Sequence, residues 1–209
     1  MKITIFGSTG GTGRELVRLG LDYGHAVTAF AREKEKLADV RNDQLRVVQG
    51  DVLDLRTVVE GVVGQDAVLS AIGAGRARTR LREDGTSNII ETMEQAGVKR
   101  LISLSSLGIG DSRSNLPFVL RYVVFPTVLR HTMADHERQE RVIRQSNLDW
   151  TIVRPSYLTD GPLTGTYLHG FSITEKKLKG KIARADVADF MLKQLEDRRY
   201  VHETPGLSY

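Results

Sequence analysis

The sequence predicts an α/β protein built on a single doubly wound parallel sheet, and three observations lead to this prediction. Short apolar runs alternate with longer amphipathic segments along the whole chain. A glycine-rich segment, GSTGGTG, directly follows the first apolar run. The 209 residues contain no internal repeat and no low-complexity segment. We therefore expect one domain over residues 1–209, with a short C-terminal extension on the substrate side.

The expected elements alternate in type along the chain. Strands are predicted where short runs are rich in Val, Ile and Leu, at 3–6, 26–30, 45–48, 67–70, 100–104 and 151–153. Amphipathic segments predict a helix that starts near Arg14 and further helices at 53–60, 84–95, 131–145 and 185–195. Ligands of such sheets bind beyond the carboxyl ends of the strands, where the strand order reverses. The residues that follow each strand are therefore candidates for a functional site.

The segment at 7–13 has the spacing of a dinucleotide-binding turn. Gly7, Gly10 and Gly13 would supply a tight turn, a close backbone approach to a pyrophosphate and close helix–sheet packing. N–H groups at the helix start would hold the phosphates, assisted by the helix dipole. A glycine-rich turn without a ligand is the alternative, but the strand in front and the helix behind favour binding. The predicted cofactor-binding residues here are Gly7, Ser8, Thr9, Gly10, Gly11, Thr12 and Gly13.

The residues after the second strand favour NADP(H) over NAD(H). An NAD site usually places Asp or Glu there, to bind the ribose 2′-hydroxyl. This chain has Ala31 followed by Arg32, with Lys36 one helical turn further. A guanidinium can bind a 2′-phosphate through two hydrogen bonds, whereas a carboxylate would repel it. The two cations could instead belong to a solvated helix face, since AREKEKL carries both signs of charge.

The other strand ends carry further candidates. Asp51, beside Val52, could accept a hydrogen bond from the adenine amino group, while Ile72 and Gly73 would let the cofactor backbone pass close. Each of these residues alone is compatible with an ordinary loop, and their coincidence at strand ends favours a site. The complete set at these ends is Asp51, Val52, Ala71, Ile72, Gly73, Ser105, Ser106, Pro155, Ser156, Tyr157 and Leu158.

Composition excludes several classes of function. The chain has no cysteine, so a disulfide framework, a thiolate zinc site and a cysteine nucleophile are excluded. Its five histidines show no HxH or HExxH spacing, so no metal site is expected. No run approaches the roughly 20 apolar residues of a membrane span, and the chain opens on a strand rather than a signal peptide. We expect a soluble cytoplasmic protein without a membrane partner.

One dense basic run, Arg76–Arg82, stands out against a small net charge of +4. Such a run can indicate nucleic-acid binding. This one contains no interleaved aromatic residue, and it falls where a loop should cross the cofactor crevice. We therefore expect a loop that is solvated or touches an anionic ligand, and no nucleic-acid partner.

Several segments in order along the chain carry a family resemblance: IFGSTGGTG, GHAVTAFAR, GDV, GQDAVLSAIG, NIIETMEQAGVKRLISLSS and SNLDWTIVRPSYLTDGPLTGTY. They resemble the compact, atypical short-chain dehydrogenases/reductases of the NmrA-like NAD(P)-binding group. Asp135-His136 followed by GPLTGTY at 161–167 is similar to the branch that contains biliverdin reductase B, an NADPH-dependent flavin reductase. The resemblance implies a monomeric NADPH-dependent reductase with a shallow, permissive pocket for flavins or other planar conjugated substrates.

The resemblance also implies roles for particular residues. Ser106 matches the serine that the family places beside the nicotinamide, and the segment 155–158 matches the one that packs against it. His136 matches a histidine near the substrate pocket. Tyr157 departs from the pattern, because the flavin reductases have a histidine there. A phenol and an imidazole differ as proton donors at neutral pH, so this departure bears on the substrate range more than on the cofactor.

The chemistry available to the chain lacks one standard component. No tyrosine is followed four residues later by lysine, so the usual acid pair of short-chain dehydrogenases is missing. A flavin or bilin ring accommodates the charge of an incoming hydride, so positioning would supply most of the catalysis. The candidate catalytic residues are Ser106 and Tyr157, as hydrogen-bond donors or proton relays.

Alternatives to a reductase are an NADP(H)-binding redox sensor that acts through a protein partner, and a nucleotide-sugar epimerase or dehydratase. The epimerase is disfavoured because few residues follow Pro155 and no Tyr-x-x-x-Lys pair exists. The expected helix segment DHERQERVIRQ is mostly charged and lacks the apolar stripe of a dimer interface, which favours a monomer.

Overall fold

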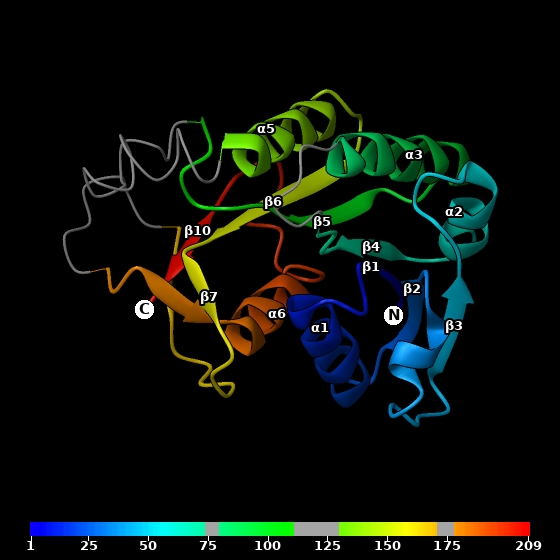
Figure 1. Cartoon of the computed structure of the whole chain (residues 1–209), viewed down its shortest axis with the longest axis horizontal. Helices are drawn as coiled ribbons and strands as arrows, with labels where there is room; N and C mark the ends of the chain where they lie inside the picture. The colour runs from blue at the N-terminus through cyan, green and yellow to red at the C-terminus, as the bar shows by residue number, and fades with distance from the viewer. Residues whose placement is uncertain (74–79, 111–129, 171–177) are drawn as a thin grey trace.

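The computed structural model describes residues 1–73, 80–110, 130–170 and 178–209, which fold around one large sheet (Figure 1). Its strands follow the order β3-β2-β1-β4-β5-β6-β10-β8. The chain runs outward from β1 to β3 and then crosses over to β4, which pairs in parallel with the other side of β1. This order confirms the doubly wound α/β class. The bounds are β1 Lys2–Phe6, β2 Ala26–Ala31, β3 Leu45–Gln49, β4 Ala67–Ser70, β5 Arg100–Leu104, β6 Asp149–Pro155, β8 Leu168–His169 and β10 Gly206–Ser208.

Two layers of helices cover the sheet. In Figure 1, α1 (Gly11–Asp22) and α6 (Arg184–Lys193) lie side by side below it. The opposite face carries α2 (Leu55–Val62), α3 (Leu81–Ala96) and α5 (Arg130–Arg144). A short 3-10 helix, η1 (Lys34–Leu37), follows β2. None of the helices in the described ranges is both long and apolar enough to cross a membrane.

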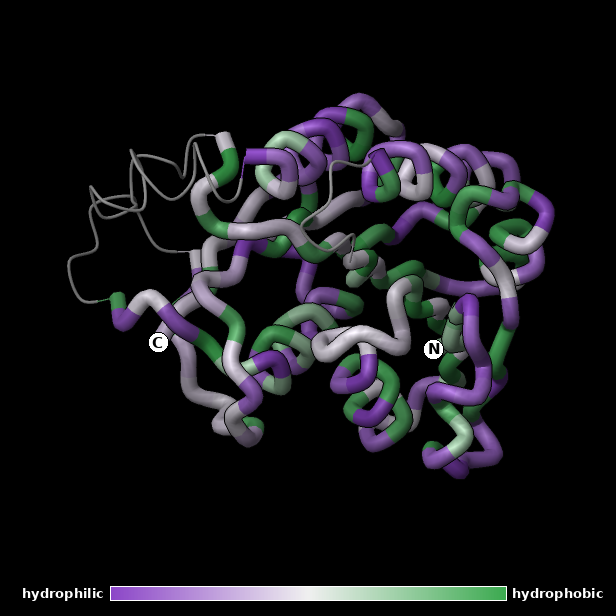
Figure 2. Tube along the Cα trace, viewed as in Figure 1, coloured by the Kyte–Doolittle hydropathy of each residue, from purple (hydrophilic) through white to green (hydrophobic). Residues whose placement is uncertain are grey.

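The core consists of two apolar clusters, one on each face of the sheet. Alternate residues of a strand point to opposite faces, so Ile3 and Ile5 of β1 join the cluster beneath α1 and α6, while Phe6 joins the other. Figure 2 shows the hydrophobic segments gathered in the interior and hydrophilic ones along the outer helix surfaces. The first cluster is closed by α6, whose residues from Ala185 to Leu192 are all buried.

Most boundaries differ from the sequence predictions by a few residues, and three differences bear on the site or the sheet. The first helix begins at Gly11 rather than near Arg14, so two glycines of the turn belong to its first helical turn. β6 extends to Pro155, beyond the predicted end at 153, because it pairs with β5 along its length and with β10 at its end. The basic run was predicted as a loop, but its end forms the start of α3 at Leu81. Residues 76–79 of that run lie outside the described residues.

The C-terminal extension enlarges the main sheet. β10 pairs in parallel with β6, and β8 pairs with β10 in the antiparallel direction, so the predicted parallel sheet carries one antiparallel strand at this edge. A separate pair of parallel strands, β7 (Tyr157–Thr159) and β9 (Lys181–Ala183), leads into α6. These short strands pair with segments far apart in sequence. Each strand has too few residues for an alternation of apolar and polar side chains to be recognised in the sequence.

Candidate active site

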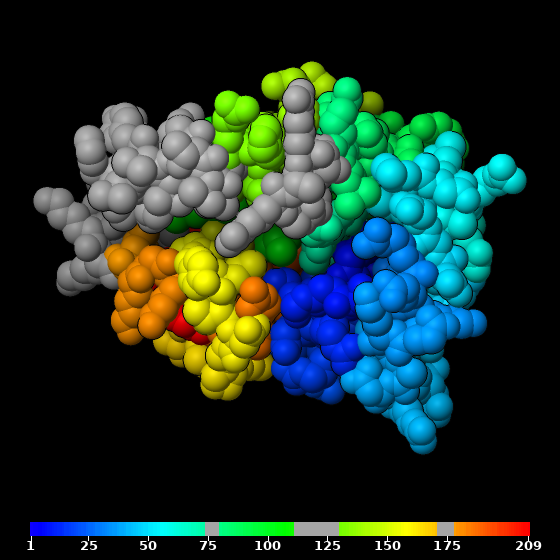
Figure 3. All heavy atoms as spheres, in the orientation of Figure 1, coloured from blue at the N-terminus to red at the C-terminus, as the bar shows by residue number. Residues whose placement is uncertain are grey.

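A cleft of about 950 Å³ lies at the carboxyl ends of β1, β2, β4, β5 and β6. Figure 3 shows the surface hollowed between the dark blue N-terminal elements and the green helices above them. The cleft collects most of the predicted site residues from seven separate segments. They are Gly7, Thr9, Gly10, Gly11, Thr12, Arg32, Asp51, Val52, Ala71, Ile72, Gly73, Ser105, Ser106, His136, Pro155, Ser156, Tyr157 and Leu158.

The glycines of the turn differ in what a side chain would meet. Gly7 has φ +75°, and a Cβ there would lie 2.4 Å from the Ala71 carbonyl oxygen. A Cβ at Gly13 would lie 2.0 Å from the Gly7 carbonyl oxygen. At Gly10 the nearest atom to a Cβ is that same oxygen at 3.4 Å, an ordinary contact. Gly7 and Gly13 are thus required by the fold, whereas Gly10 leaves open the space in front of the helix.

The start of α1 is suited to hold a pyrophosphate. Gly10 precedes the helix without a capping side chain, and the Arg14 N–H donates the first helical hydrogen bond to its carbonyl at 2.8 Å. The N–H groups of Gly11, Thr12 and Gly13 therefore have no acceptor within the helix. Such groups, with the positive end of the helix dipole, bind phosphate oxygens. The turn thus fits a dinucleotide, as the sequence predicts.

Arg184, the first residue of α6, adds a cation that the sequence analysis did not identify. A Cβ at Gly11 would lie 2.7 Å from the Arg184 Cδ and Nε atoms, so the side chain crosses the turn. Its guanidinium forms an ion pair with the exposed Asp160. Arg184 lines the cleft and could reach a pyrophosphate held at the turn. Nothing in the local sequence marks this residue, because only the packing of α6 on α1 brings it there.

The end of β2 presents one cation to the cleft rather than two. Arg32 is exposed and lines the cleft, and among the described residues its side chain forms no ion pair. Lys36 lies outside the lining and pairs with Glu33 at 2.7 Å. The Ser8 side chain is also turned away from the cleft, since its hydroxyl is buried and donates to the Phe30 carbonyl at 2.8 Å. Arg32 is therefore the residue placed to meet a 2′-phosphate.

On the other side of the cleft, the predicted cofactor-binding residue Ser105 and the predicted catalytic residues Ser106 and Tyr157 differ in their surroundings. The Ser105 hydroxyl donates to Glu140 Oε1 at 2.7 Å, so it points into a buried network. The Ser106 hydroxyl donates only a long bond, 3.2 Å, to the Leu107 carbonyl. Tyr157 is 77% exposed, and within the described ranges its hydroxyl has no hydrogen-bond partner. Ser106 and Tyr157 are thus the hydroxyls available to a bound molecule.

A buried ion pair supports this side of the cleft. Glu140 of α5 accepts from Arg154 of β6 through Nε at 2.9 Å and Nη2 at 2.6 Å. Both side chains are almost completely buried. The same carboxylate accepts from Ser105, so it fixes the ends of β5 and β6 against α5. The sequence analysis missed this pair, since the charged pattern of the helix resembles a solvated surface.

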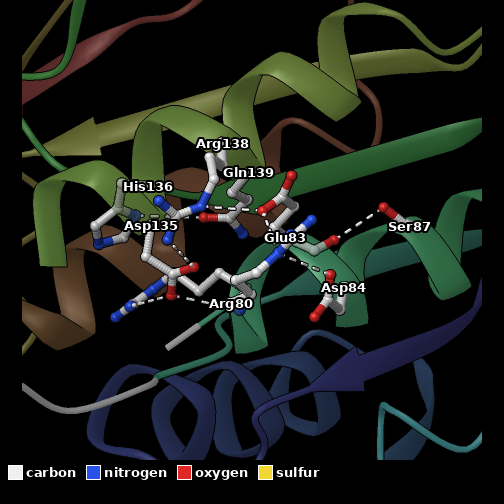
Figure 4. Close-up of polar contacts among 9 residues, drawn as sticks. Arg80, Glu83, Asp84, Ser87, Asp135, His136, Arg138 and Gln139 are labelled. Atoms are coloured by element: carbon white, nitrogen blue, oxygen red, sulfur yellow. Dashed lines mark hydrogen bonds and ion pairs between the residues drawn. The ribbon is translucent and has the colours of Figure 1, made fainter. Parts of the chain in front are cut away.

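His136 forms part of the cleft wall in a neutral state. Burial, and then the nearby Arg82 cation, lower its pKa from 6.5 to about 3. Its Nδ1 lies 3.3 Å from Gln139 Oε1 (Figure 4). The Gln139 amide nitrogen lies 3.2 Å from the Ser103 hydroxyl. With Gln139 Oε1 as acceptor, Nδ1 carries the proton and the other ring nitrogen can accept a hydrogen bond. His136 can therefore contact a substrate without adding charge.

The segment GPLTGTY, which carried much of the family resemblance, is held by α6. Asp186 accepts from the N–H groups of Thr164 and Gly165 at 2.9 and 2.8 Å. Asp189 accepts from the Tyr167 hydroxyl at 2.6 Å, and burial and this carboxylate raise the pKa of that phenol well above its usual range. These contacts are structural. They fix the segment that follows the Tyr157–Leu158 edge of the cleft.

The arrangement can bind a dinucleotide along the strand ends and leaves room beside it for a second molecule. A bound nicotinamide cofactor would supply a hydride to an acceptor. The chain's own contribution would be to orient the two rings through the 155–158 segment, to exclude water with Leu158 and Met133, and to donate hydrogen bonds from Ser106 and Tyr157. Among the described residues, no group of three His, Asp or Glu side chains could hold a metal.

Comparisons with known proteins agree with this geometry. A family model described as NAD(P)H-binding matches residues 7–198. YhfK of Bacillus subtilis, named an uncharacterized sugar epimerase, is 28% identical over 95% of this chain and 89% of its own length. The structure of a short-chain dehydrogenase/reductase from Veillonella parvula in complex with NADP has a TM-score of 0.82 at 19% identity, covering 100% of this chain and 94% of that one. ChuY from Escherichia coli O157:H7, described as an anaerobillin reductase, has a TM-score of 0.80 at 24% identity, and the match covers 100% of this chain and 97% of ChuY. Because the family model spans most of its length, the chain belongs to the NAD(P)H-binding family.

Proposed function

We propose that this protein is an NADPH-dependent reductase that transfers a hydride to a planar conjugated acceptor such as a flavin or a bilin. The observation that carries the proposal is the continuous cleft, in which one end is lined by the glycine turn and Arg32 and the other by Ser106, His136 and Tyr157. A volume of about 950 Å³ lies at the upper end for ligand pockets, which suits a cofactor and an acceptor together.

The preference for NADPH follows from the end of β2. Arg32 lines the cleft and has no ion-pair partner among the described residues. The last residue of β2 is Ala31, where an NAD site usually has Asp or Glu. A charge-assisted pair with the 2′-phosphate would favour NADPH by about 1.5–3 kcal/mol. The NADP bound to the Veillonella parvula structure supports this choice by analogy of fold.

The acceptor class follows from what the second half of the cleft contains. Ser106 and the exposed Tyr157 contribute hydroxyls to this half of the cleft, and no Tyr-x-x-x-Lys pair is present in the sequence. A carbonyl substrate needs an acid to protonate its oxygen, whereas a conjugated ring disperses the charge of the hydride. The name of ChuY, anaerobillin reductase, supports a bilin-like acceptor.

The test is steady-state oxidation of NADPH with riboflavin, FMN or biliverdin as acceptor, with a control that lacks the acceptor. We expect oxidation that depends on the acceptor and proceeds faster with NADPH than with NADH. Tight NADPH binding without turnover of any acceptor would contradict the proposal and favour the redox-sensor hypothesis. Conversion of a nucleotide sugar without net cofactor oxidation would instead favour an epimerase.

A further inference from the structure

The first turn of α3 places a buried arginine in the wall of the cleft. Arg82 is 6% exposed and lines the cleft together with Leu81, Met133 and His136. A buried guanidinium normally uses most of its five donors, because an unsatisfied buried donor is costly. The hydrogen bonds of Arg82 are therefore informative about what else it can bind.

Arg82 has a single acidic partner and keeps an unused edge. Its Nη1 donates to Asp135 Oδ2 at 3.1 Å, the one side-chain hydrogen bond that it forms with the described residues. Its Nε is buried and has no partner. In a guanidinium, the N–H bonds of Nε and Nη2 point in the same direction and form a fork that matches a carboxylate or a phosphate. The fork of Arg82 thus has no hydrogen-bond partner among the described residues.

The neighbouring acidic residues are already engaged by other cations. Arg138 lies 3.4 Å from Asp135 Oδ1 and 3.0 Å from Glu83, and Arg80 lies 3.1 Å from Glu83 (Figure 4). Asp135 is completely buried, so it is held in place between α3 and α5. The carboxylates of this network therefore fix the position of Arg82 and do not neutralise its free edge.

We propose that Arg82 binds an anionic group, a carboxylate or a phosphate, of the acceptor that this cleft reduces. The inference rests on the proposed reductase function. Arg32 and Arg184 lie at the glycine-turn side of the cleft, where the phosphates of the dinucleotide would bind, whereas Arg82 lies on the opposite helical layer beside Met133 and His136 of α5. The neutral His136 next to it offers no competing charge.

The test compares anionic ligands with their neutral counterparts in binding to the NADP⁺-saturated protein, measured by calorimetry. FMN and riboflavin differ by a phosphate, so this pair tests phosphate binding. Biliverdin and its dimethyl ester differ in their carboxylates, so this pair tests carboxylate binding. In the unaltered protein we expect at least one anionic ligand to bind about 10- to 100-fold more tightly than its neutral partner. In Arg82→Met this ratio should fall to about one. The pair that shows the effect identifies the anion.

Matched variants separate this role from a structural one. Arg80→Met removes an exposed arginine two positions earlier and should leave the ratio unchanged. Arg82→Lys keeps the charge beside Asp135 but lacks the fork, and it should retain only part of the preference. If Arg82→Met fails to fold because the buried Asp135 keeps only Arg138 as a cationic partner, the double variant Arg82→Met/Asp135→Asn removes both charges and provides the same measurement.

Two results would overturn the inference. One is a loss of NADPH affinity in Arg82→Met as large as the loss of acceptor affinity, which would assign the arginine to the cofactor. The other is equal affinity of the unaltered protein for the anionic and neutral ligands of both pairs. A preference for the anion in binding, without NADPH oxidation by any acceptor, would leave this inference standing and contradict the reductase function, so the two failures are distinguishable.

Discussion

The two ends of the cleft are built by different means. At the phosphate end, the Gly7–Gly13 turn is formed by one strand–turn–helix unit, and Arg32 follows directly at the end of the next strand. At the acceptor end, which comprises Ser105, Ser106, His136 and Tyr157, the positions depend on buried side-chain contacts between α3, α5, β5 and β6. The phosphate end is therefore a local structure, whereas the acceptor end exists only in the folded protein.

This difference predicts how each end responds to mutation. A change at the phosphate end should alter cofactor binding and leave the fold intact, provided that the glycine is one that the fold does not require. A change in the network beneath the acceptor end should reduce stability first. The following predictions test this contrast.

The largest effect is expected from the buried pair beneath the acceptor end. Glu140→Gln removes the buried carboxylate that pairs with Arg154 and accepts from Ser105, so the free energy of unfolding should fall by about 3–5 kcal/mol in chemical denaturation. The matched control is Glu15→Gln, which removes a carboxylate paired with Arg18 at the surface and should change stability by less than about 1 kcal/mol. Equal effects of the two substitutions would contradict the supporting role of this pair.

Gly10→Val tests the phosphate end. A side chain at this position meets no close atom of the fold but would occupy the space of the pyrophosphate, so NADPH affinity should fall more than 100-fold, about 2.7 kcal/mol, with little change in stability. Gly13→Ala is the contrast, because its Cβ would overlap the Gly7 carbonyl oxygen and should destabilise the protein. NADPH affinity retained in a folded Gly10→Val protein would count against the phosphate site.

Arg32→Ala tests the choice between the two cofactors. We expect a loss of about 1.5–3 kcal/mol in NADPH binding and almost no change for NADH, because only the 2′-phosphate contact is removed. Lys36→Ala serves as the control, since Lys36 lies outside the cleft and pairs with Glu33. Calorimetry with both cofactors measures the effect. Equal affinities of the unaltered protein for NADPH and NADH would reject the assignment.

His136 predicts a pH dependence of stability that originates at the acceptor end. Its pKa is lowered to about 3 by burial, so below pH 6.5 the unfolded chain binds a proton that the folded protein does not. Stability should therefore decrease as the pH falls, by about 2 kcal/mol between pH 7.5 and pH 5 from this residue alone. In His136→Asn this part of the pH dependence of the unfolding free energy should disappear. In His131→Asn, a variant on the same helix, it should remain. Identical slopes for the unaltered protein and His136→Asn would disprove the buried neutral state.

The smallest effect is expected at the exposed hydroxyls. Tyr157→Phe should lower kcat by about 10-fold or less, because a conjugated acceptor depends on positioning more than on one proton donor, and a lost general acid costs 10²–10⁴-fold. Ser106→Ala should behave similarly. The measurement is steady-state turnover with saturating NADPH. A loss of a thousand-fold in Tyr157→Phe, with NADPH binding intact, would identify an essential acid and favour a carbonyl or enone substrate.

The sequence by itself determined the glycine turn and the doubly wound class of the sheet. The glycine spacing, the apolar runs and Ala31-Arg32 are local signals, because the strand, the turn and the helix start are formed by consecutive residues. They were sufficient to predict the cleft position, the dinucleotide class and most of the lining residues, although the helix begins at Gly11.

Only the tertiary structure decided the acceptor end. Asp135, Gln139 and Glu140 look like a solvated helix face in the sequence, yet they are buried against α3, β5 and β6. Arg184 reaches the glycine turn from α6, a helix distant in sequence. A charged residue can be buried when its partner comes from another element, and periodicity carries no information about such partners.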